Sequence, residues 1–303
     1  MNISQTIVDG LVQGGMYAIV AVGYTMVYGV IGMINFAHGE VYMIGAFTGL
    51  MVMTGLALIG ITSVPVMLLL ALIVVIIVAS ATGFVIERVA YRPLRGKHRL
   101  IPLISAIGVS LFLQNYYQIT QGSRVFAAMD VSEGGKNVYM VGEIAITPLQ
   151  LTVLMAAIVI MILLSLFVSK TKIGWACRAT EQDRRMANLL GINTDNIISL
   201  VFVIGSALAG IAGVLLSLIE VSITSFMGFA IGIKAFAAAV LGGIGSIPGA
   251  FIGGFIIGFA EKISQGSDLI GSDYSDVMVF GILLLILLVR PSGILGKPEI
   301  EKV

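Results

Sequence analysis

Residues 41–86 read VYMIGAFTGLMVMTGLALIGITSVPVMLLLALIVVIIVASATGFVI and contain no formal charge. A transmembrane α-helix needs about 20 predominantly apolar residues to cross the hydrocarbon core of a bilayer. This stretch is therefore long enough for two spans, and the glycine and proline between residues 60 and 65 place the break between them. The stretch predicts a membrane protein built from helices.

The composition extends this interpretation to the whole chain. The 303 residues are 58% hydrophobic and 11% charged, with a mean hydropathy of +1.07, whereas soluble domains carry about 25% charged residues. The net charge of +1 argues against a nucleic-acid partner, and the single cysteine, Cys177, excludes an intramolecular disulfide and a cysteine metal cluster. No Pro-rich or low-complexity linker divides the chain, so we expect a single transmembrane domain over residues 1–303.

Charge-free runs define the remaining spans. Besides residues 41–86, they cover residues 10–39, 100–123, 144–169, 196–219 and 235–260. The last candidate span, residues 277–289, is short, and it crosses if Asp276 lies at the outer interface and Arg290 extends to the inner one. We expect an all-α polytopic protein with about eight spans plus broken or re-entrant segments.

The basic residues predict the orientation of these spans. Arg and Lys cluster in residues 88–99, in residues 170–185 and in the C-terminal tail that begins at Arg290. Cytoplasmic loops are rich in these residues, so we place all three segments in the cytoplasm. The segments between them carry mainly acidic residues, which suits the outer face. Counting back through three spans leaves the N-terminus outside, unless a re-entrant segment between residues 31 and 47 changes the parity.

Two glycine-rich stretches interrupt the regular spans. Residues 32–45 read GMINFAHGEVYMIG, and residues 239–254 read AVLGGIGSIPGAFIGG. A continuous helix is unfavourable there, because each glycine costs about 1 kcal/mol relative to alanine and an interior proline about 3 kcal/mol. Irregular backbone at membrane depth faces either protein or a water-filled cavity, so we interpret both stretches as pathway elements. The alternative is close helix packing through small residues such as Gly213, Gly253 and Gly254.

The candidate substrate pathway consists of glycines and polar groups from these two stretches. The residues are Asn35, His38, Gly39, Gly243, Gly245 and Ser246. We place Asn35 and His38 nearest the path, with Ser246 opposite. Alternatively, these polar groups satisfy the backbone at a helix break.

The two stretches also share a spacing. Gly32-x-Ile34-x4-Gly39 recurs as Gly242-x-Ile244-x4-Gly249. Paired interruptions in two halves of a transporter are typical of an inverted repeat with the substrate site between its copies. For the second stretch we predict a turn at mid-depth that joins two short arms. The alternative places this glycine turn at the cytoplasmic surface.

No motif for catalysis accompanies these spans. His38 and Glu40 are two residues apart and point to different faces of a helix, and His98 lies in a basic loop, so no metal site is expected. The chain has no GxSxG, HExxH or GxxxxGK[ST] motif. Glu261 lies near a span end, where an interfacial anchor is the simplest interpretation. We expect no catalytic residue and no cofactor bound by this chain. An ion-coupled secondary transporter and an intramembrane enzyme remain the alternatives from other classes.

Residues 171–191, TKIGWACRATEQDRRMANLLG, form a charged loop that has the sequence features of a helix. Thr180 is spaced to cap the N-terminus of a short helix with Asp183 three residues on, and Gly191 is placed to end it. The pattern predicts a compact helix on the inner face, within a loop over residues 170–195. The alternative is an ordinary basic cytoplasmic loop.

Five blocks along the chain carry a family resemblance. They are GYTMVYGVIGMINFAHGEVYMIGAF (residues 23–47), IERVAYRPLR (86–95), LISAIGVSLFLQNY (103–116), GWACRATEQDRRMANLLGINTD (174–195) and KAFAAAVLGGIGSIPGAFIGGFIIGFAE (234–261). Together with the tail RPSGILGKPEIEKV they resemble the LivH-type permease subunit of bacterial high-affinity branched-chain amino-acid ABC importers. The resemblance covers nearly the whole chain. The urea/amide-type ABC permease shares the NxAHGE and GGIGSIPG blocks and is the alternative on substrate.

This resemblance implies a multi-pass permease of the bacterial cytoplasmic (inner) membrane that translocates leucine, isoleucine and valine. The implied partners are a homologous second permease subunit (a heterodimer), two cytoplasmic ATPase subunits that use ATP, a periplasmic or lipid-anchored amino-acid-binding protein, and the lipid bilayer. The coupling residues that it implies are Thr180, Asp183, Arg185, Ala187, Leu190 and Gly191. Ala187 and Gly191 match the EAA-x3-G pattern of permease coupling helices, whereas Arg185 and Met186 stand where Glu and Ala are expected.

Overall fold

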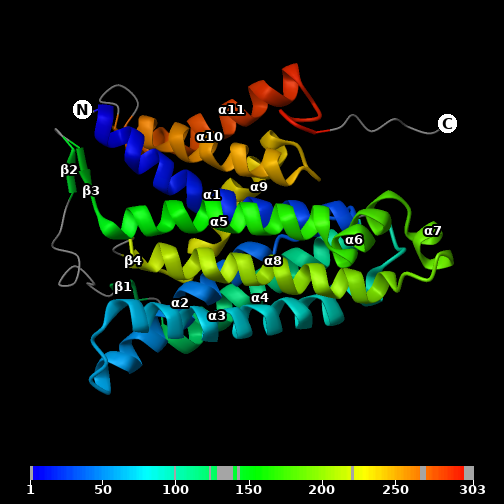
Figure 1. Cartoon of the computed structure of the whole chain (residues 1–303), viewed down its shortest axis with the longest axis horizontal. Coiled ribbons are helices and arrows are strands. Elements are labelled where there is room, and N and C mark those ends of the chain that lie inside the picture. Colours follow the sequence, from blue (N-terminus) through cyan, green and yellow to red (C-terminus); the bar gives the residue numbers. More distant parts are fainter. Residues whose placement is uncertain are drawn as a thin grey trace. The chain divides into compact units, whose positions relative to one another are not determined.

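The structure, a computed structural model, describes residues 3–98, 100–122, 124–127, 139–141, 144–219, 222–266 and 271–296. Eleven α-helices make up most of this described part (Figure 1). They are α1 (Ile3–Ile31), α2 (His38–Leu58), α3 (Val64–Ile86), α4 (Leu100–Gln121), α5 (Pro148–Lys170), α6 (Lys172–Gln182), α7 (Arg184–Leu189), α8 (Thr194–Ser217), α9 (Met227–Gly242), α10 (Ile247–Gly266) and α11 (Ser275–Val289). The short elements are a π-helical turn η1 (Glu87–Tyr91), 3₁₀ turns η2 (Arg92–Leu94) and η4 (Ser272–Tyr274), and strands β1 (Phe126–Ala127), β2 (Tyr139–Val141), β3 (Ile144–Ile146) and β4 (Ser222–Ile223).

Seven of the described helices, α1 to α5, α8 and α10, are long and apolar enough to cross a membrane. Two apolar helices, α9 and α11, are shorter. This confirms the prediction of an all-α polytopic membrane protein. The predicted count of about eight spans becomes seven long helices and two short ones, because the charge-free run over residues 235–260 is divided between α9 and α10.

The first glycine-rich break is shorter than predicted. The helix α1 ends at Ile31, Gly32 has a φ of +71°, and α2 begins at His38. Gly39 and Gly45 therefore lie inside a helix, where we had expected irregular backbone. Glycine is retained there because α2 packs closely: a Cβ on Gly45 would lie 2.6 Å from the Cα of Gly210 on α8.

The chain divides into two compact units, each described by itself. Unit 2 comprises Met26–Lys136 and Leu166–Ile233. Its helices α2, α3 and α8 pack side by side (Figure 1). Gly213 of α8 lies against the backbone of Tyr42 on α2, so the packing alternative holds for this glycine. At one end of the unit, β1 and β4 pair antiparallel, with Phe126 opposite Ile223.

Unit 1 comprises Met1–Thr25, Asn137–Ser165 and Lys234–Val303. Within it α10 packs against α1 at small residues: a Cβ on Gly254 would lie 2.7 Å from that of Ala18, and Gly258 lies against Gly14. Packing through small residues therefore also explains this glycine-studded helix. The strands β2 and β3 form an antiparallel hairpin in the same unit.

The second glycine-rich break is a tight turn between α9 and α10. Gly243 and Gly245 have φ values of +103° and +91°, which side-chain-bearing residues rarely adopt. Ser246 then caps α10, because its Oγ accepts from the N–H of Gly249 at 3.2 Å. The prediction of a helix interruption at this point is confirmed.

The contacts of this turn bear on the mid-depth position that we predicted. The N–H groups of Ile294 and Leu295 donate to the carbonyls of Leu241 and Gly242, both at 2.9 Å. The turn therefore lies against the segment that directly follows α11, at the end of that helix where Arg290 is found. This favours the alternative in which the glycine turn lies at the cytoplasmic surface.

Candidate functional site

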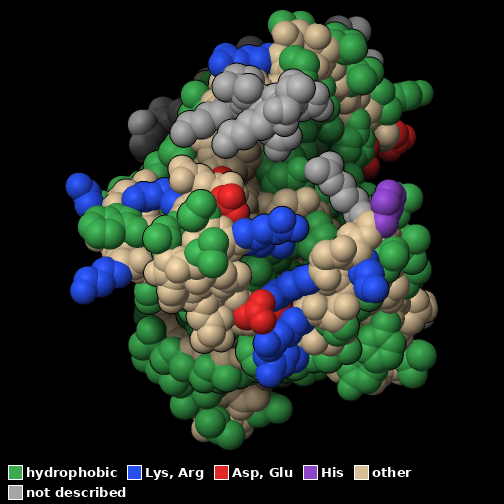
Figure 2. Space-filling model, turned by 90° about the vertical axis from the view of Figure 1, so that its right-hand side faces the viewer, with side chains coloured by type: hydrophobic (Ala, Val, Ile, Leu, Met, Phe, Trp, Pro, Cys, Tyr) green, Lys and Arg blue, Asp and Glu red, His purple; other side chains and the backbone are tan. Residues whose placement is uncertain are grey.

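One end of unit 2 gathers two of the three segments that the charge pattern assigned to the cytoplasm. The helices α6 and α7 lie at this end, as do the turns η1 and η2 that follow α3. Figure 2 shows blue Lys and Arg side chains gathered around red acidic ones on this face. The turn between α1 and α2 lies here too, since Arg184 Nη2 donates to the carbonyl of Val30 at 2.9 Å. The two predicted cytoplasmic loops are adjacent, because Arg184 of the second loop lies close enough to Arg95 of the first for their charges to interact.

The short helix α7 begins differently from the prediction. Its N-cap is Asp183, whose carboxylate accepts from the N–H groups of Arg185 at 2.8 Å and Met186 at 3.0 Å. Thr180 instead lies buried inside α6, where its hydroxyl donates to the carbonyl of Ala176 at 2.8 Å. The predicted cap at Thr180 is wrong, because the chain becomes extended at Asp183 and starts a new helix there.

The end of α7 follows the prediction. Gly191 has a φ of +85° and lies directly after the C-cap residue, Leu190. Its N–H donates to the carbonyl of Asn188 at 3.0 Å, and the N–H of Ile192 donates to that of Ala187 at 3.0 Å. A left-handed residue that satisfies the last carbonyls is a common way for a helix to end.

The side chains of α7 and its C-cap fall into a buried group and an exposed group. Ala187 is buried, so it faces the rest of unit 2. Arg185, Met186, Leu189 and Leu190 are exposed. Exposed apolar side chains beside an exposed arginine are typical of a surface that a protein partner covers. Ala187 is therefore suited to hold α7 in place, and the other four to make contact.

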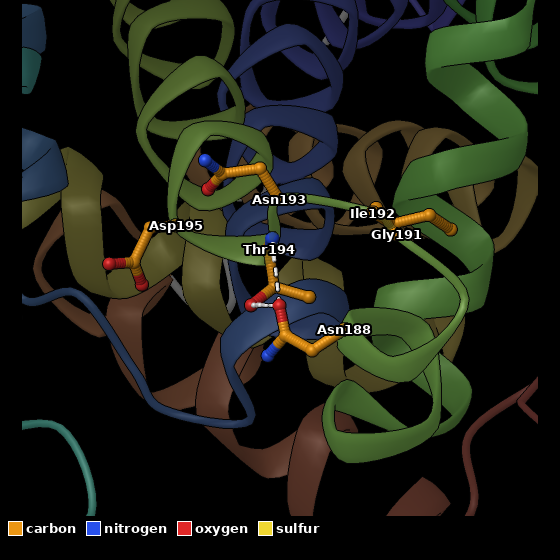
Figure 3. Close-up of a pocket in the computed structure, with 6 residues that line it drawn as sticks. All are labelled: Asn188, Gly191, Ile192, Asn193, Thr194 and Asp195. Carbon is orange, nitrogen blue, oxygen red and sulfur yellow. Dashed lines mark hydrogen bonds between the residues drawn. The ribbon is translucent and has the colours of Figure 1, made fainter.

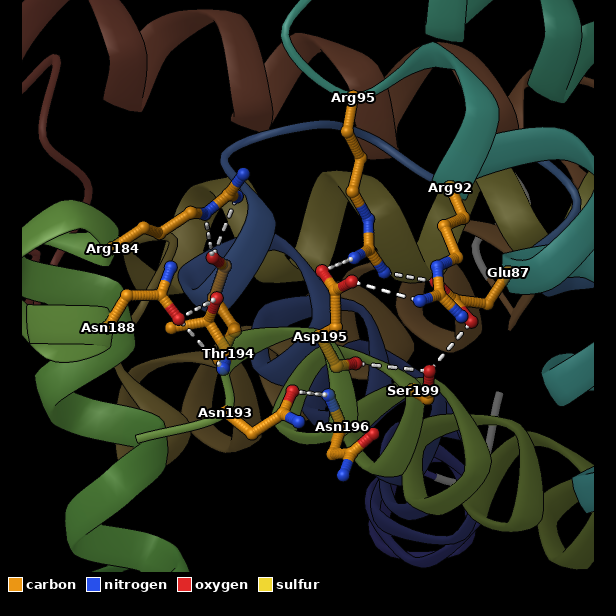
Figure 4. Close-up of polar contacts among 11 residues, drawn as sticks. Glu87, Arg92, Arg95, Arg184, Asn188, Asn193, Thr194, Asp195, Asn196 and Ser199 are labelled. Atoms are coloured by element: carbon orange, nitrogen blue, oxygen red, sulfur yellow. Dashed lines mark hydrogen bonds and ion pairs between the residues drawn. The ribbon is translucent and has the colours of Figure 1, made fainter. Parts of the chain in front are cut away.

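A charge network fixes the start of α8 to the turns after α3 (Figure 4). The carboxylate of Asp195 accepts from Arg92 Nη2 at 3.0 Å and from Arg95 Nη1 at 2.5 Å. Arg95 also pairs with the fully buried Glu87, whose second oxygen accepts from Ser199 Oγ at 2.8 Å. A buried carboxylate requires such partners, because an uncompensated charge away from water is strongly unfavourable.

The side chain of Arg184 joins α7 to this region. It is half-buried beside the Arg92, Arg95 and Asp195 cluster (Figure 4). Burial, together with the positive charge of Arg95, lowers the pKa of the Arg184 guanidinium, although arginine stays protonated in proteins. Its Nε and Nη2 donate to the carbonyl oxygen of Val30, at 3.2 Å and 2.9 Å, so α7 is attached to the end of α1.

A cavity of about 400 Å³ lies at the corner between α7 and α8. Its lining residues are Asn188, Gly191, Ile192, Asn193, Thr194 and Asp195 (Figure 3). The Asn188 side chain closes the corner, because its Oδ1 accepts from the hydroxyl of Thr194 at 3.1 Å. Asn193 caps α8 by accepting from the N–H of Asn196 at 3.1 Å. The corner is thus held by side chains on both helices.

The sequence did not single out Glu87, Arg95 or Asp195. A signal was available, because Glu87 directly precedes the basic segment of residues 88–99 and Asp195 follows the basic segment of residues 170–185. Opposite charges in separate loops indicate an ion pair only when the loops are known to be in contact. That contact is known only from the tertiary structure.

The predicted pathway residues of the first break lie in unit 2. Asn35 is buried in the turn between α1 and α2, and its Oδ1 accepts from the N–H of Ala37 and from the hydroxyl of Tyr91, both at 3.2 Å. His38 is the first residue of α2 and is buried. Gly39 lies against Gly228 of α9. The contacts of Asn35 match the alternative in which it satisfies the backbone at a helix break.

A further buried polar group lies in the first turn of α2. The carboxylate of Glu40 is fully buried, and its Oε1 accepts from Ser110 Oγ at 2.9 Å. The remaining predicted pathway residues, Gly243, Gly245 and Ser246, belong to unit 1. The two groups of predicted pathway residues are thus assigned to separate units, and a shared pathway stays a prediction.

Known proteins show what this chain is similar to. The family described as "Branched-chain amino acid transport system / permease component" matches residues 6–288. The high-affinity branched-chain amino acid transport system permease protein BraD of Pseudomonas aeruginosa is 53% identical over 99% of this chain and 97% of its own length. LivH of Escherichia coli K12, a permease protein of the same kind of system, is 50% identical with the same coverage. No solved structure matches this chain.

A third relative is more distant. LivM of Escherichia coli K12, also a permease protein of a high-affinity branched-chain amino acid transport system, is 26% identical over 99% of this chain and 72% of its own length. Seven long apolar helices and full-length similarity to permeases define a multi-pass membrane transport protein. The chain belongs to the family of permease components of branched-chain amino acid transport systems. Its relatives are transport subunits and not enzymes.

Proposed function

We propose that this chain is the membrane-spanning permease subunit of an ATP-driven importer that takes up leucine, isoleucine and valine. The observation that carries this proposal is identity of 53% to BraD and 50% to LivH across 97% of each protein. Both relatives are named for high-affinity branched-chain amino acid transport. This supports the branched-chain substrate over the urea/amide alternative.

The complete importer contains further subunits under this proposal. The similarity to LivM supports a homologous second permease subunit that pairs with this chain. Two cytoplasmic ATPase subunits bind and hydrolyse ATP, and a periplasmic or lipid-anchored protein delivers the amino acid. The assembly lies in the bacterial cytoplasmic membrane, and this chain binds no cofactor of its own.

The surface for the ATPase is α7 in this proposal. Its exposed residues Arg185, Met186, Leu189 and Leu190 form the contact, and Asp183, Ala187 and Gly191 fix the helix in shape and position. Thr180 is buried in α6, so it does not touch the ATPase and contributes only by stabilising the helix that precedes α7. Arg185 and Met186 place a cation and a thioether on this surface, where the EAA-x3-G pattern of permease coupling helices has Glu and Ala.

Movement of α7 has a direct route into the membrane helices. Arg184 attaches α7 to the end of α1, and the Asn188 contact attaches it to the start of α8. Asp195 then links α8 to the turns after α3. A partner acts on a conformational equilibrium only through contacts that differ between its states. Closure of the ATPase subunits against α7 would therefore bias the arrangement of α1, α3 and α8.

Transport by the reconstituted importer tests the proposed function. Proteoliposomes that contain both permease subunits and the two ATPases, supplied with binding protein and internal ATP, should accumulate labelled leucine and not labelled urea. Accumulation of urea in preference to leucine would select the urea/amide alternative. Uptake by this chain alone, driven by an ion gradient without ATPase subunits, would select the secondary transporter.

Substitutions in α7 test the coupling role. Ala187→Leu and Gly191→Val should insert and assemble normally, yet reduce leucine uptake per ATP hydrolysed by about tenfold, because each displaces the contact surface. Ala81→Leu, an exposed alanine on α3, makes the same change in size without touching α7 and should leave this ratio unchanged. Normal coupling in both α7 variants would contradict the assignment.

The residues Asn35, His38, Gly39, Gly243, Gly245 and Ser246 remain our candidates for the pathway. A path lined by glycine backbone and few polar side chains offers little with which to reject a substrate of similar shape. We therefore expect the permease to be less selective than its binding protein. Leucine flux should fall in the Asn35→Ala, His38→Ala double variant with the binding protein held constant. Normal flux would remove these two residues from the pathway.

A further inference from the structure

Lys234 in unit 1 lies between two carboxylates from different helices. Its Nζ is 2.8 Å from Glu261 Oε1 on α10 and 2.7 Å from Asp276 Oδ1 on α11. Lys234 itself belongs to the apolar helix α9. Ionisable groups in membrane helices are rare and mark binding sites or pathways more often than stability devices.

One half of this cluster is buried and rigid. The Glu261 side chain is only 6% exposed, so it is not the interfacial anchor that its position in the sequence indicated. Its Oε2 accepts from the hydroxyl of Tyr17 at 2.6 Å, and Gln13 Nε2 donates to that hydroxyl at 2.9 Å. Glu261 is therefore held by α1 as well, and it fixes the Lys234 ammonium from the buried side.

The other half of the cluster is open. The Asp276 side chain is 61% exposed, whereas that of Lys234 is 13% exposed. Ion pairs with an exposed partner contribute little stability and exchange readily. An ammonium has three N–H donors, and the contacts to Glu261 and Asp276 use two of them. Among the described residues, Lys234 thus has one fixed partner and one exchangeable partner, and its ammonium carries a third N–H donor.

We propose that Lys234 and Asp276 form a subsite for the charged head group of an α-amino acid. The α-carboxylate of the substrate binds the Lys234 ammonium, and its α-ammonium pairs with the carboxylate of Asp276. Charge stays balanced in this exchange. The zwitterion opens the ion pair between Lys234 and Asp276 and forms two new ones, one with each side chain. Glu261 keeps Lys234 in position throughout. This inference rests on the proposed function, since it takes the cargo to be an amino acid.

Two further observations fit this assignment. Asp276 lies in the first turn of α11, at the opposite end of that helix from Arg290. The charge pattern places this end outside, where a binding protein would deliver the substrate. The subsite also contacts only the α-carboxylate and the α-ammonium, which all α-amino acids share. Selection for a branched side chain is then left to the binding protein, and an uncharged molecule such as urea gains nothing from the two charges.

Ligand-dependent thermal unfolding of the importer complex, in detergent and without binding protein, tests the subsite. A ligand that binds only the folded state raises the unfolding temperature. Millimolar L-leucine should raise it, whereas leucinamide, 4-methylpentanoate and urea should not, because each lacks one or both charges of the zwitterion. Lys234→Met and Asp276→Asn should raise the leucine concentration for half-maximal effect by about tenfold or more.

Lys262→Met is the matched control. Lys262 neighbours Glu261 on α10 and donates to Gln265 at 3.1 Å, and Gln265 in turn donates to Glu261 Oε1 at 3.3 Å. In the described part of the chain Lys262 forms no ion pair with Asp276, so its removal should leave the leucine response unchanged. If Lys234→Met fails to fold, Asp276→Asn decides alone, because an exposed carboxylate is dispensable for folding. A lower unfolding temperature with an unchanged leucine response in these variants would show a structural clamp and overturn the proposal. Leucine uptake by the wild-type proteoliposomes reports separately on the proposed function.

Discussion

The carboxylate of Asp195 lies 2.5 Å from Nη1 of Arg95, which joins the first turn of α8 to the turn after α3. The Asp195 side chain is 49% exposed, whereas Glu87, the other partner of Arg95, is completely buried. The Arg95 guanidinium therefore has one partner that is in contact with water, Asp195, and one that is shielded from it, Glu87. The two ion pairs should differ greatly in their contribution to stability.

Removal of each carboxylate should show this difference. Glu87→Ala leaves Arg95 with a buried, partly uncompensated charge and should lower the free energy of unfolding by about 3 kcal/mol. Asp195→Ala breaks a partly exposed pair and should lower it by less than about 1 kcal/mol. Denaturant unfolding of the detergent-purified protein measures both. Equal effects would show that Asp195 is as important for stability as Glu87.

The two interpretations of the α7 N-cap make opposite predictions. Asp183→Ala removes the carboxylate that accepts from Arg185 and Met186 and should weaken α7 by about 1 kcal/mol. The exposed helix should fray, and leucine uptake per ATP hydrolysed should fall with it. Asp183→Asn retains an acceptor and should preserve coupling. Thr180→Val is the control, because in the described part of the chain the Thr180 hydroxyl donates within α6, and its loss should leave α7 intact.

Much of the fold follows from the distribution of charge along the sequence. Charge-free runs predicted the positions of the long helices, because a span cannot accommodate unpaired charges. The interruption around Gly243 was also predictable, since clustered glycines and a proline disfavour a continuous helix. Gly39 and Gly45 were misassigned for the same reason. An interior glycine is also favoured where a neighbouring helix approaches closely, and the approach of Gly210 to Gly45 is a tertiary fact.

The candidate site was less predictable than the fold. The coupling loop stood out because its charges interrupt an apolar chain, yet Thr180 and Asp183 have equally good capping chemistry. Only the backbone at Asp183 distinguishes them. The contacts of Lys234 with Glu261 and Asp276 join residues far apart in sequence, so no local pattern reports them.

The single cysteine gives a probe of α6. Burial, followed by the negative charge of Glu181, raises the pKa of the Cys177 thiol. The thiolate is the reactive form, so maleimide should label Cys177 slowly at neutral pH and faster as the pH approaches the raised pKa. Glu181→Gln removes the like charge, lowers this pKa and should accelerate labelling at pH 8. Glu181→Asp retains the charge and should behave as wild type, as intact mass spectrometry can measure. Unchanged labelling in Glu181→Gln would assign the slow reaction to burial alone.

Labelling from each side of the membrane determines the position of the α9–α10 turn. In a Cys177→Ser background, Ser246→Cys should react with impermeant maleimide added from the cytoplasmic side. The reason is that Ile294 and Leu295, which follow Arg290, donate to the carbonyls of Leu241 and Gly242 at 2.9 Å. The positive-inside rule assigns the segment with Arg290 to the cytoplasm, and the turn must accompany it.

The opposite end of α10 provides the matched control for this experiment. Gln265 is exposed and lies near the C-terminal end of that helix. A helix of 20 residues spans about 30 Å, which equals the thickness of the hydrocarbon core. Gln265→Cys should therefore react only from the external side. Protection of Ser246→Cys from both sides, with normal labelling of Gln265→Cys, would restore a turn at mid-depth and with it the assignment of Gly243, Gly245 and Ser246 to the membrane interior.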